Sequence, residues 1–250
     1  MDARPWVRSV RPEARARLFC FGYAGGGTAE FRAWLDGLSP AIDLCPVVLP
    51  GRENRIAERA FDDLPALVEA LVPALAPVAA LAPFAVYGHS MGSWVAFEWV
   101  RALRRLRKPL PVQLMVGARR APHRPGRLPP LSPLPDAAFV AAVQERYGGI
   151  PKAIRADPEL MRLFLPPLRA DFSLLDRYRY RDEPPLPVPL TLFYGTADPN
   201  DEVADLRAWA EHTSAGCAVV ALPFGHFFVR DAADDITDRV NAALRPAISA

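Results

Sequence analysis

The sequence predicts an α/β protein built on a mainly parallel β-sheet with helices on both faces. Short runs rich in β-branched and aromatic residues alternate with stretches of helical periodicity, and this alternation is typical of a parallel sheet wrapped by helices. The runs expected to form strands are residues 17–21, 44–49, 84–87, 112–116, 190–194 and 218–222. The stretches expected to form helices are residues 30–38, 64–81, 93–106, 203–212 and 232–244.

Length and composition fit one such domain over residues 1–250. The chain has 250 residues, and 51% of them are hydrophobic, which is enough for a substantial core. Its 30 basic and 28 acidic residues give a formal charge of only +2, and no nucleic-acid-binding motif accompanies it. We therefore expect no nucleic-acid partner.

We also expect no membrane span and a cytoplasmic location. The longest apolar stretch, residues 66–85, is interrupted by Glu69 and three prolines, and the first residues contain no apolar leader segment.

The three cysteines, Cys20, Cys45 and Cys217, lie far apart in or beside apolar runs. This spacing favours reduced thiols over disulfides or a metal site.

Basic residues gather at the end of the helix expected at 93–106. An exposed, solvated helix end is the favoured interpretation, because cations there complement the helix dipole. A docking patch for an acidic partner is the alternative. The residues concerned are Arg101, Arg104, Arg105, Arg107 and Lys108.

The alternation of strands and helices stops over residues 119–188, which begin with a proline- and arginine-rich stretch. A structureless loop of this length is uncommon in a compact domain. Residues 135–147, 158–165 and 168–178 have helical patterns, so we expect a helical lid inserted between two sheet strands. Its apolar side chains either line an acyl channel or simply pack the lid onto the body.

A G-x-S-x-G sequence, Gly88 to Gly92, lies between an expected strand and an expected helix. This context is typical of a nucleophile elbow, in which a strained turn lifts the serine hydroxyl clear of the sheet edge. Gly88 and Gly92 leave the room that such a turn requires. The pentapeptide alone also fits an ordinary strand-to-helix turn, so Ser90 needs partners elsewhere in the chain.

In an α/β-hydrolase the catalytic serine is followed along the chain first by the acid and then by the histidine. This sequence offers candidates in that order. Asp198 follows the expected strand 190–194, and His226 follows the expected strand 218–222. We expect His226 to take the proton of Ser90 and Asp198 to orient the imidazole. The competing candidates are Asp201 and Asp171 for the acid, and His89, His123 and His212 for the base.

The oxyanion hole is expected from two backbone amides. The fold supplies the N–H of the residue after the nucleophile, here Met91, and a second one from the loop after the first strand. Residues 22–28 form that loop, and its glycines lead us to choose the Ala24 N–H. The loop lacks the lysine of a phosphate-binding loop and the G-x-G-x-x-G spacing of a dinucleotide site.

With these sites placed, the chain resembles the type II thioesterases, stand-alone α/β-hydrolases that accompany polyketide synthases and nonribosomal peptide synthetases. The resemblance runs nearly end to end. One departure is Tyr23, where the family commonly has histidine. The motifs that carry the resemblance are YAGG (23–26), PGRENR (50–55), GHSMG (88–92), RRAP (119–122) and GHFF (225–228).

The resemblance implies a catalytic triad of Ser90, Asp198 and His226 and oxyanion amides at Ala24 and Met91. It also implies hydrolysis of aberrant acyl groups from the phosphopantetheine arms of acyl or peptidyl carrier proteins, which are then the expected partners. No cofactor and no metal are expected. The alternatives are a small-molecule carboxylesterase, a product-releasing thioesterase of the kind usually fused to a synthase, and a non-catalytic carrier-binding scaffold.

Overall fold

A computed structural model describes residues 6, 7 and 11–249 of the protein. Its sheet has six strands, all parallel, in the order β2-β1-β3-β4-β5-β6. The mainly parallel α/β fold that the sequence predicts is thereby confirmed. The strands are β1 (Ala16–Phe21), β2 (Ile42–Pro46), β3 (Phe84–His89), β4 (Gln113–Gly117), β5 (Leu190–Gly195) and β6 (Cys217–Leu222).

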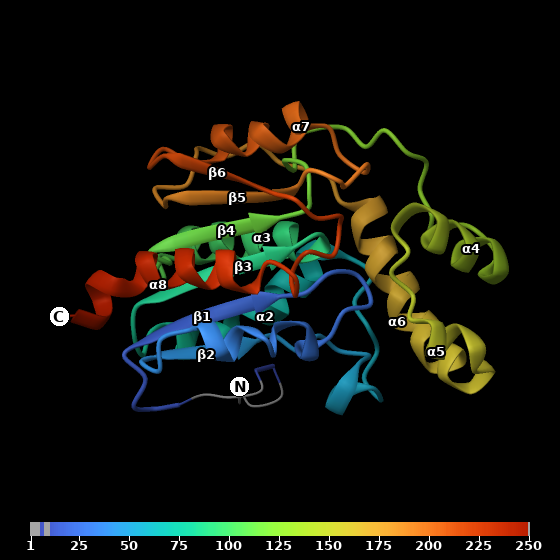
Figure 1. Ribbon diagram of the computed structural model, residues 1–250, viewed down its shortest axis with the longest axis horizontal. Coiled ribbons are helices and arrows are strands. Elements are labelled where there is room, and N and C mark those ends of the chain that lie inside the picture. The colour runs from blue at the N-terminus through green and yellow to red at the C-terminus, as the bar shows by residue number, and fades with distance from the viewer. Residues whose placement is uncertain (1–5, 8–10, 250) are drawn as a thin grey trace.

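Helices cover both faces of the sheet (Figure 1). In β1, Phe19 and Phe21 pack with α2 (Leu64–Ala79) and α3 (Met91–Arg105), whereas Leu18 and Cys20 pack with α8 (Ala233–Ser249) on the other face. This division follows from the alternation of side chains along a strand. Two clusters of buried side chains therefore flank the sheet. Strands β1 to β5 are mostly buried, as their nearly continuous apolar sequences require, whereas the edge strand β6 is partly exposed.

The first expected helix, residues 30–38, is wrong in extent. The structure has a 3-10 turn, η1 (Thr28–Phe31), followed by one helical turn, α1 (Trp34–Gly37). Phe31 and Trp34 are both buried beside the sheet, and Gly37 lies so close to Thr237 of α8 that a Cβ atom there would overlap it. The expected and observed helices end at nearly the same residue, and they differ in the break between η1 and α1.

The second strand also ends earlier than expected, at Pro46 instead of Leu49. Beyond it the chain turns to the N-terminal segment, where Val47 forms an isolated antiparallel bridge with Val7 and the Val48 N–H donates to the Trp6 carbonyl. The Val47 N–H still donates to the Cys20 carbonyl of β1 at 2.8 Å, so the chain leaves the sheet only after this residue. The apolar pattern of the sequence does not show this departure.

Between β4 and β5 the chain forms three helices, which Figure 1 shows grouped at one end of the sheet. They are α4 (Asp136–Tyr147), α5 (Lys152–Ala156) and α6 (Pro158–Arg177). The sequence predicted two helices where α6 is one, because Pro166 and Pro167 looked like a break. The carbonyl groups that the prolines leave without donors lie on the exposed turn around Arg162 and Leu163, and the apolar stripe of the helix continues through the pair.

The arginine cluster at the end of α3 is a solvated helix end, as the sequence suggested, only at Arg105, Arg107 and Lys108, which are exposed. Arg101 is only 2% exposed and pairs with Glu98 and Glu183. Arg104 and Arg105 also pair with Glu183. One carboxylate thus binds three guanidinium groups and ties α3 to the segment before β5. Among the described residues, no helix is both long and apolar enough to cross a membrane.

Candidate active site

Ser90 occupies a sharp turn between β3 and α3. Its φ of 53° and ψ of −114° are unusual for a residue with a side chain. The turn is possible because Gly88 and Gly92 approach backbone so closely that a Cβ on either would overlap it, at Gly92 and at Phe21 respectively. The Ser93 hydroxyl lies 2.9 Å from the Gly88 carbonyl and 2.8 Å from the Gly117 carbonyl, which anchors the turn to β4.

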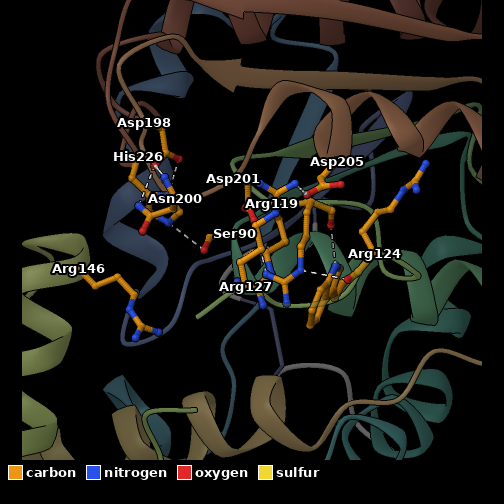
Figure 2. Close-up of polar contacts among 12 residues, drawn as sticks. Ser90, Arg119, Arg124, Arg127, Arg146, Asp198, Asn200, Asp201, Asp205 and His226 are labelled. Carbon is orange, nitrogen blue, oxygen red and sulfur yellow. Dashed lines mark hydrogen bonds and ion pairs between the residues drawn. The ribbon is translucent and has the colours of Figure 1, made fainter. Parts of the chain in front are cut away.

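The structure brings Ser90, His226 and Asp198 together in a continuous hydrogen-bonded chain (Figure 2). Ser90 Oγ lies 3.0 Å from His226 Nε2, and His226 Nδ1 lies 2.7 Å from Asp198 Oδ2. Because a carboxylate only accepts, Nδ1 carries the proton and Nε2 is left to accept from the serine hydroxyl. This is the geometry of a serine nucleophile activated by a histidine base.

Asp198 is held as a carboxylate. Burial alone raises its pKa, but the hydrogen bond and charge of His226 and two hydrogen bonds from Asn200 outweigh burial and lower the pKa. Asn200 donates from its backbone N–H at 3.0 Å and from Nδ2 at 2.7 Å, both to Asp198 Oδ1. Sequence reasoning missed Asn200, although an Asp-Pro-Asn sequence is a common turn former and could have indicated this contact.

The two competing acids have other partners. Asp201 accepts from the Arg120 backbone N–H at 3.1 Å and lies 3.5 Å from the Arg120 guanidinium. Asp171, on α6, accepts from the Gly25 N–H at 2.8 Å and from Arg52 at 2.7 Å. Neither carboxylate is hydrogen-bonded to His226.

Among the competing histidines, His89 points away from the Ser90 hydroxyl but still serves the site. Its Nε2 lies 2.8 Å from the His226 carbonyl oxygen, and its Nδ1 lies 2.9 Å from the Tyr87 hydroxyl. Burial, followed by the charge of His226, lowers the pKa of His89 to about 3. The neutral ring therefore donates through Nε2 to His226 and accepts through Nδ1 from Tyr87. Its role in positioning His226 was not foreseen.

His123 and His212 form a separate pair, with His123 Nδ1 2.7 Å from His212 Nε2. Burial, followed by the charges of His123 and Arg101, lowers the pKa of His212 to about 4. Both rings pack edge-on or tilted against Tyr180, and the pair has no hydrogen bond to Ser90, Asp198 or His226 among the described contacts.

The loop after β1 is fixed from two sides. Gly25 has a φ of +77°, and a Cβ there would overlap Phe164 and Leu168 of α6. Arg52 donates to the Gly26 carbonyl at 3.1 Å and also binds Asp171, which in turn accepts from Gly25. Ala24, whose amide is one of the expected oxyanion donors, thus lies in a loop with little freedom, and Met91 begins α3 directly after Ser90.

An apolar cavity opens at Ser90 and His226. Tyr23, Ala24 and Phe227 form its wall on the sheet side, and the three-helix insertion supplies the opposite wall. The Tyr23 ring packs against Phe227 with centroids 4.7 Å apart. The enclosed space is only about 20 Å³, room for little more than one water molecule. The lining residues from the insertion are Val143, Tyr147, Gly149, Ile150, Leu168, Phe172 and Leu175.

The parallel sheet, the serine elbow and the Ser90–His226–Asp198 chain define a serine hydrolase with the α/β-hydrolase fold. The Thioesterase domain family matches residues 16–244, so the chain belongs to the thioesterase family. It is therefore a thioester hydrolase.

Individual relatives place it more narrowly. RedJ, a thioesterase from the prodiginine biosynthetic pathway in Streptomyces coelicolor, superposes with a TM-score of 0.85 at 34% identity, over 94% of this chain and 88% of RedJ. The type II thioesterase BorB, from the borrelidin biosynthetic cluster, superposes with a TM-score of 0.83 at 32% identity, over 96% of this chain and 97% of BorB. The resemblance to type II thioesterases is confirmed.

A curated relative from Brevibacillus parabrevis is 37% identical over 245 residues, 96% of this chain and 92% of its own length. It is named linear gramicidin dehydrogenase LgrE. The glycines after β1, Gly25 to Gly27, do not have the G-x-G-x-x-G spacing of a dinucleotide site. We therefore assign no dehydrogenase activity to this chain.

Proposed function

We propose that this protein hydrolyses acyl thioesters on the phosphopantetheine arms of acyl and peptidyl carrier proteins, and that it removes aberrant acyl groups from polyketide or nonribosomal peptide synthases. The observation that carries the proposal is the chain of hydrogen bonds from Ser90 through His226 to Asp198. The likeness to type II thioesterases of biosynthetic clusters supports the choice of substrate.

In the proposed mechanism Ser90 Oγ attacks the thioester carbonyl while His226 Nε2 takes the hydroxyl proton. The amides of Ala24 and Met91 stabilise the oxyanion. As the tetrahedral intermediate collapses, the carbon–sulfur bond breaks and the imidazolium returns its proton to the departing sulfur. Water then attacks the Ser90 ester, with His226 again as base, and releases the carboxylic acid.

Asp198 stays ionised through this cycle and stabilises the positive imidazolium. Its bonds to Asn200 hold the second carboxylate oxygen, so the carboxylate keeps one orientation towards His226. The segment between β4 and β5 acts as a lid in this proposal, because α4, the residues after it and α6 contribute to the lining of the apolar cavity. With only about 20 Å³ enclosed, an acyl chain enters as this wall moves.

The test is hydrolysis of an acyl-carrier-protein series from acetyl to octanoyl beside matched simple esters, with the wild type and Ser90→Ala. Cleavage of the carrier-bound thioesters that depends on Ser90 is the expected result. Turnover confined to simple esters would instead make the protein a small-molecule carboxylesterase. Full biological effect of Ser90→Ala in a producing strain would favour a non-catalytic scaffold.

A further inference from the structure

A second cavity, lined by arginines, adjoins the active site. It encloses about 60 Å³, three times the space of the apolar cavity, and runs from the buried His226 to the exposed segment 126–129. We call it the arginine cavity. Figure 2 shows several of its side chains beside the Ser90–His226–Asp198 chain. Its charged lining residues are Arg119, Arg120, Arg127, Arg146, Asp176 and Asp201.

The two cavities share Tyr147, Phe172, Leu175 and His226 as common walls. His226 thus faces both spaces. A thioester whose carbonyl carbon reaches Ser90 can place its acyl chain in the apolar cavity and its thiol portion in the arginine cavity. The polar side of the site is therefore available to the leaving group.

The carboxylates do not balance the guanidinium groups within this lining. Asp176 already accepts from two backbone amides, those of Leu131 and Ser132, at 3.1 and 2.9 Å. Asp201 lies 3.5 Å from Arg120. Among the contacts of the described residues, Arg146 donates to a neutral carbonyl, that of Pro129, at 3.2 Å.

Arg127 differs, since it pairs with Glu202 and Asp205, which do not line the cavity. The other three arginines therefore face two carboxylates and leave an excess positive charge inside the cavity.

Arg119 and Arg120 are the two arginines whose positions best suit the binding of an anion. Both guanidinium groups lie over the ring of Trp94, with Cζ 4.0 and 5.1 Å from its centroid. Arg119 is 6% exposed, and its buried Nε has no hydrogen-bond partner among the described residues. Burial, followed by the charge of Arg119, lowers the pKa of Arg120. Two like charges held together in this way are stabilised by a bound anion.

We propose that the arginine cavity binds the phosphate ester of the phosphopantetheine leaving group. The inference rests on the proposed function, because it takes phosphopantetheine thioesters as the substrate class. Guanidinium groups match the oxygens of a phosphate in pairs, and the excess charge in the cavity suits a phosphate diester. The same 4′-phosphate position is occupied in all sources of the arm: it is a diester on a carrier protein, part of a diphosphate in coenzyme A and a monoester in free 4′-phosphopantetheine.

The experiment compares kcat/KM for one short acyl group on pantetheine, on 4′-phosphopantetheine, on coenzyme A and on a carrier protein. We expect 4′-phosphopantetheine to exceed pantetheine at least about tenfold, mainly through KM, as charge-assisted hydrogen bonds to one phosphate allow. The advantage shrinks as salt is raised. A comparable gain with acyl-coenzyme A shows that the phosphate is recognised in both sources.

Variants locate the site. Arg120→Gln and the partly exposed Arg146→Gln lower the ratio of phosphorylated to unphosphorylated substrate several-fold, and Arg146→Gln serves if a variant nearer Trp94 does not fold. Arg239→Gln, exposed on α8, is the matched control and leaves the ratio at its wild-type value. A loss of the same size in Arg239→Gln would contradict the assignment.

Two results overturn the phosphate site. One is equal kcat/KM with and without the phosphate in the wild type. The other is a gain that occurs only on the intact carrier protein, which attributes recognition to protein–protein contact. In both, Ser90-dependent cleavage of acyl-pantetheine persists, so the proposed function stands. If no thioester is cleaved in a Ser90-dependent way, the proposed function itself fails.

Discussion

The Asp171 carboxylate on α6 accepts a hydrogen bond at 2.8 Å from the Gly25 N–H, 146 residues earlier in the chain. Its other oxygen binds Arg52, which also donates to the Gly26 carbonyl. Helix α6 therefore holds the loop that contains Ala24, whose amide is a proposed oxyanion donor. Both oxygens of the buried Asp171 are thus engaged by the loop and by Arg52, and Asp198 is the carboxylate hydrogen-bonded to His226.

Replacing Asp171 should impair turnover more than binding. Asp171→Ala removes the acceptor of Gly25 and leaves Arg52 without its partner, so we expect kcat to fall at least about tenfold and unfolding to be easier by about 3 kcal/mol. Steady-state kinetics with a short acyl thioester and thermal unfolding measure the two effects. Asp62→Ala, which breaks an exposed pair with Arg177, is the control. Unchanged kcat in Asp171→Ala would contradict the role of the loop.

His89 should act on catalysis through the backbone of His226. His89→Leu removes the donor to the His226 carbonyl, and we expect kcat to fall about tenfold with little change in KM, because a buried acceptor loses its hydrogen bond. His89→Gln keeps an N–H donor and should restore most of the activity. A KM effect equal to the kcat effect, or no rescue by glutamine, would argue that His89 only fills space.

The free energy of unfolding should begin to fall at a pH well above the pKa values of the carboxylates. The folded-state pKa values of His89, about 3, and His212, about 4, lie below the ordinary value of 6.5. Between these values the unfolded chain binds more protons, so stability falls as pH decreases below 6.5, by about 1.4 kcal/mol per pH unit for each histidine. Asp198, with a lowered pKa, loses its contribution only at more acidic pH.

Chemical unfolding between pH 7.5 and 5 measures this slope. His212→Gln, whose amide can keep a hydrogen bond to His123, should reduce the slope by about half, because one of the two histidines no longer titrates. A free energy of unfolding that does not change over this pH range would refute the assignment of both histidines as buried neutral groups.

Val143 should limit the acyl chain length. It lies on α4 and is buried in the wall of the apolar cavity. Val143→Ala enlarges the cavity, and each methylene of substrate newly buried there adds about 0.8 kcal/mol, about fourfold in kcat/KM. We expect the octanoyl-to-acetyl ratio to rise. Val219→Ala on β6, where Val219 is exposed, is the control. A ratio shifted towards acetyl would contradict this placement of the chain.

Much of the fold could be predicted because it depends on local pattern. All six described strands overlap the apolar runs found in the sequence, and the expected elbow has Ser90 at the start of α3. Helix boundaries were less predictable where distant contacts decide them. Residues 28–37 divide into η1 and α1, with Phe31 and Trp34 buried beside the sheet, and the apolar stripe of α6 continues through the two prolines within it.

The candidate site likewise contains residues that the sequence predicts and residues that it does not. Chain order after the strands was enough to select Ser90, Asp198 and His226, which the structure brings within hydrogen-bond distance. The contacts of His89 and Asp171 were not predictable, because each joins segments more than a hundred residues apart. A buried histidine and a buried aspartate carry no sequence signal that identifies such partners.

The helices between β4 and β5 have a hydrophobic core of their own. Leu131, Phe139, Val143, Ile150, Leu168 and Phe172 pack together separately from the two clusters that flank the sheet. Changes within this small core can therefore alter the shape of the apolar cavity without repacking the two clusters that flank the sheet. Substrate range can accordingly evolve within this core as long as Asp171 of α6 keeps its contact with the Gly25 loop. An exchange of this segment between homologues that share the contact offers a direct route to enzymes with new acyl preferences.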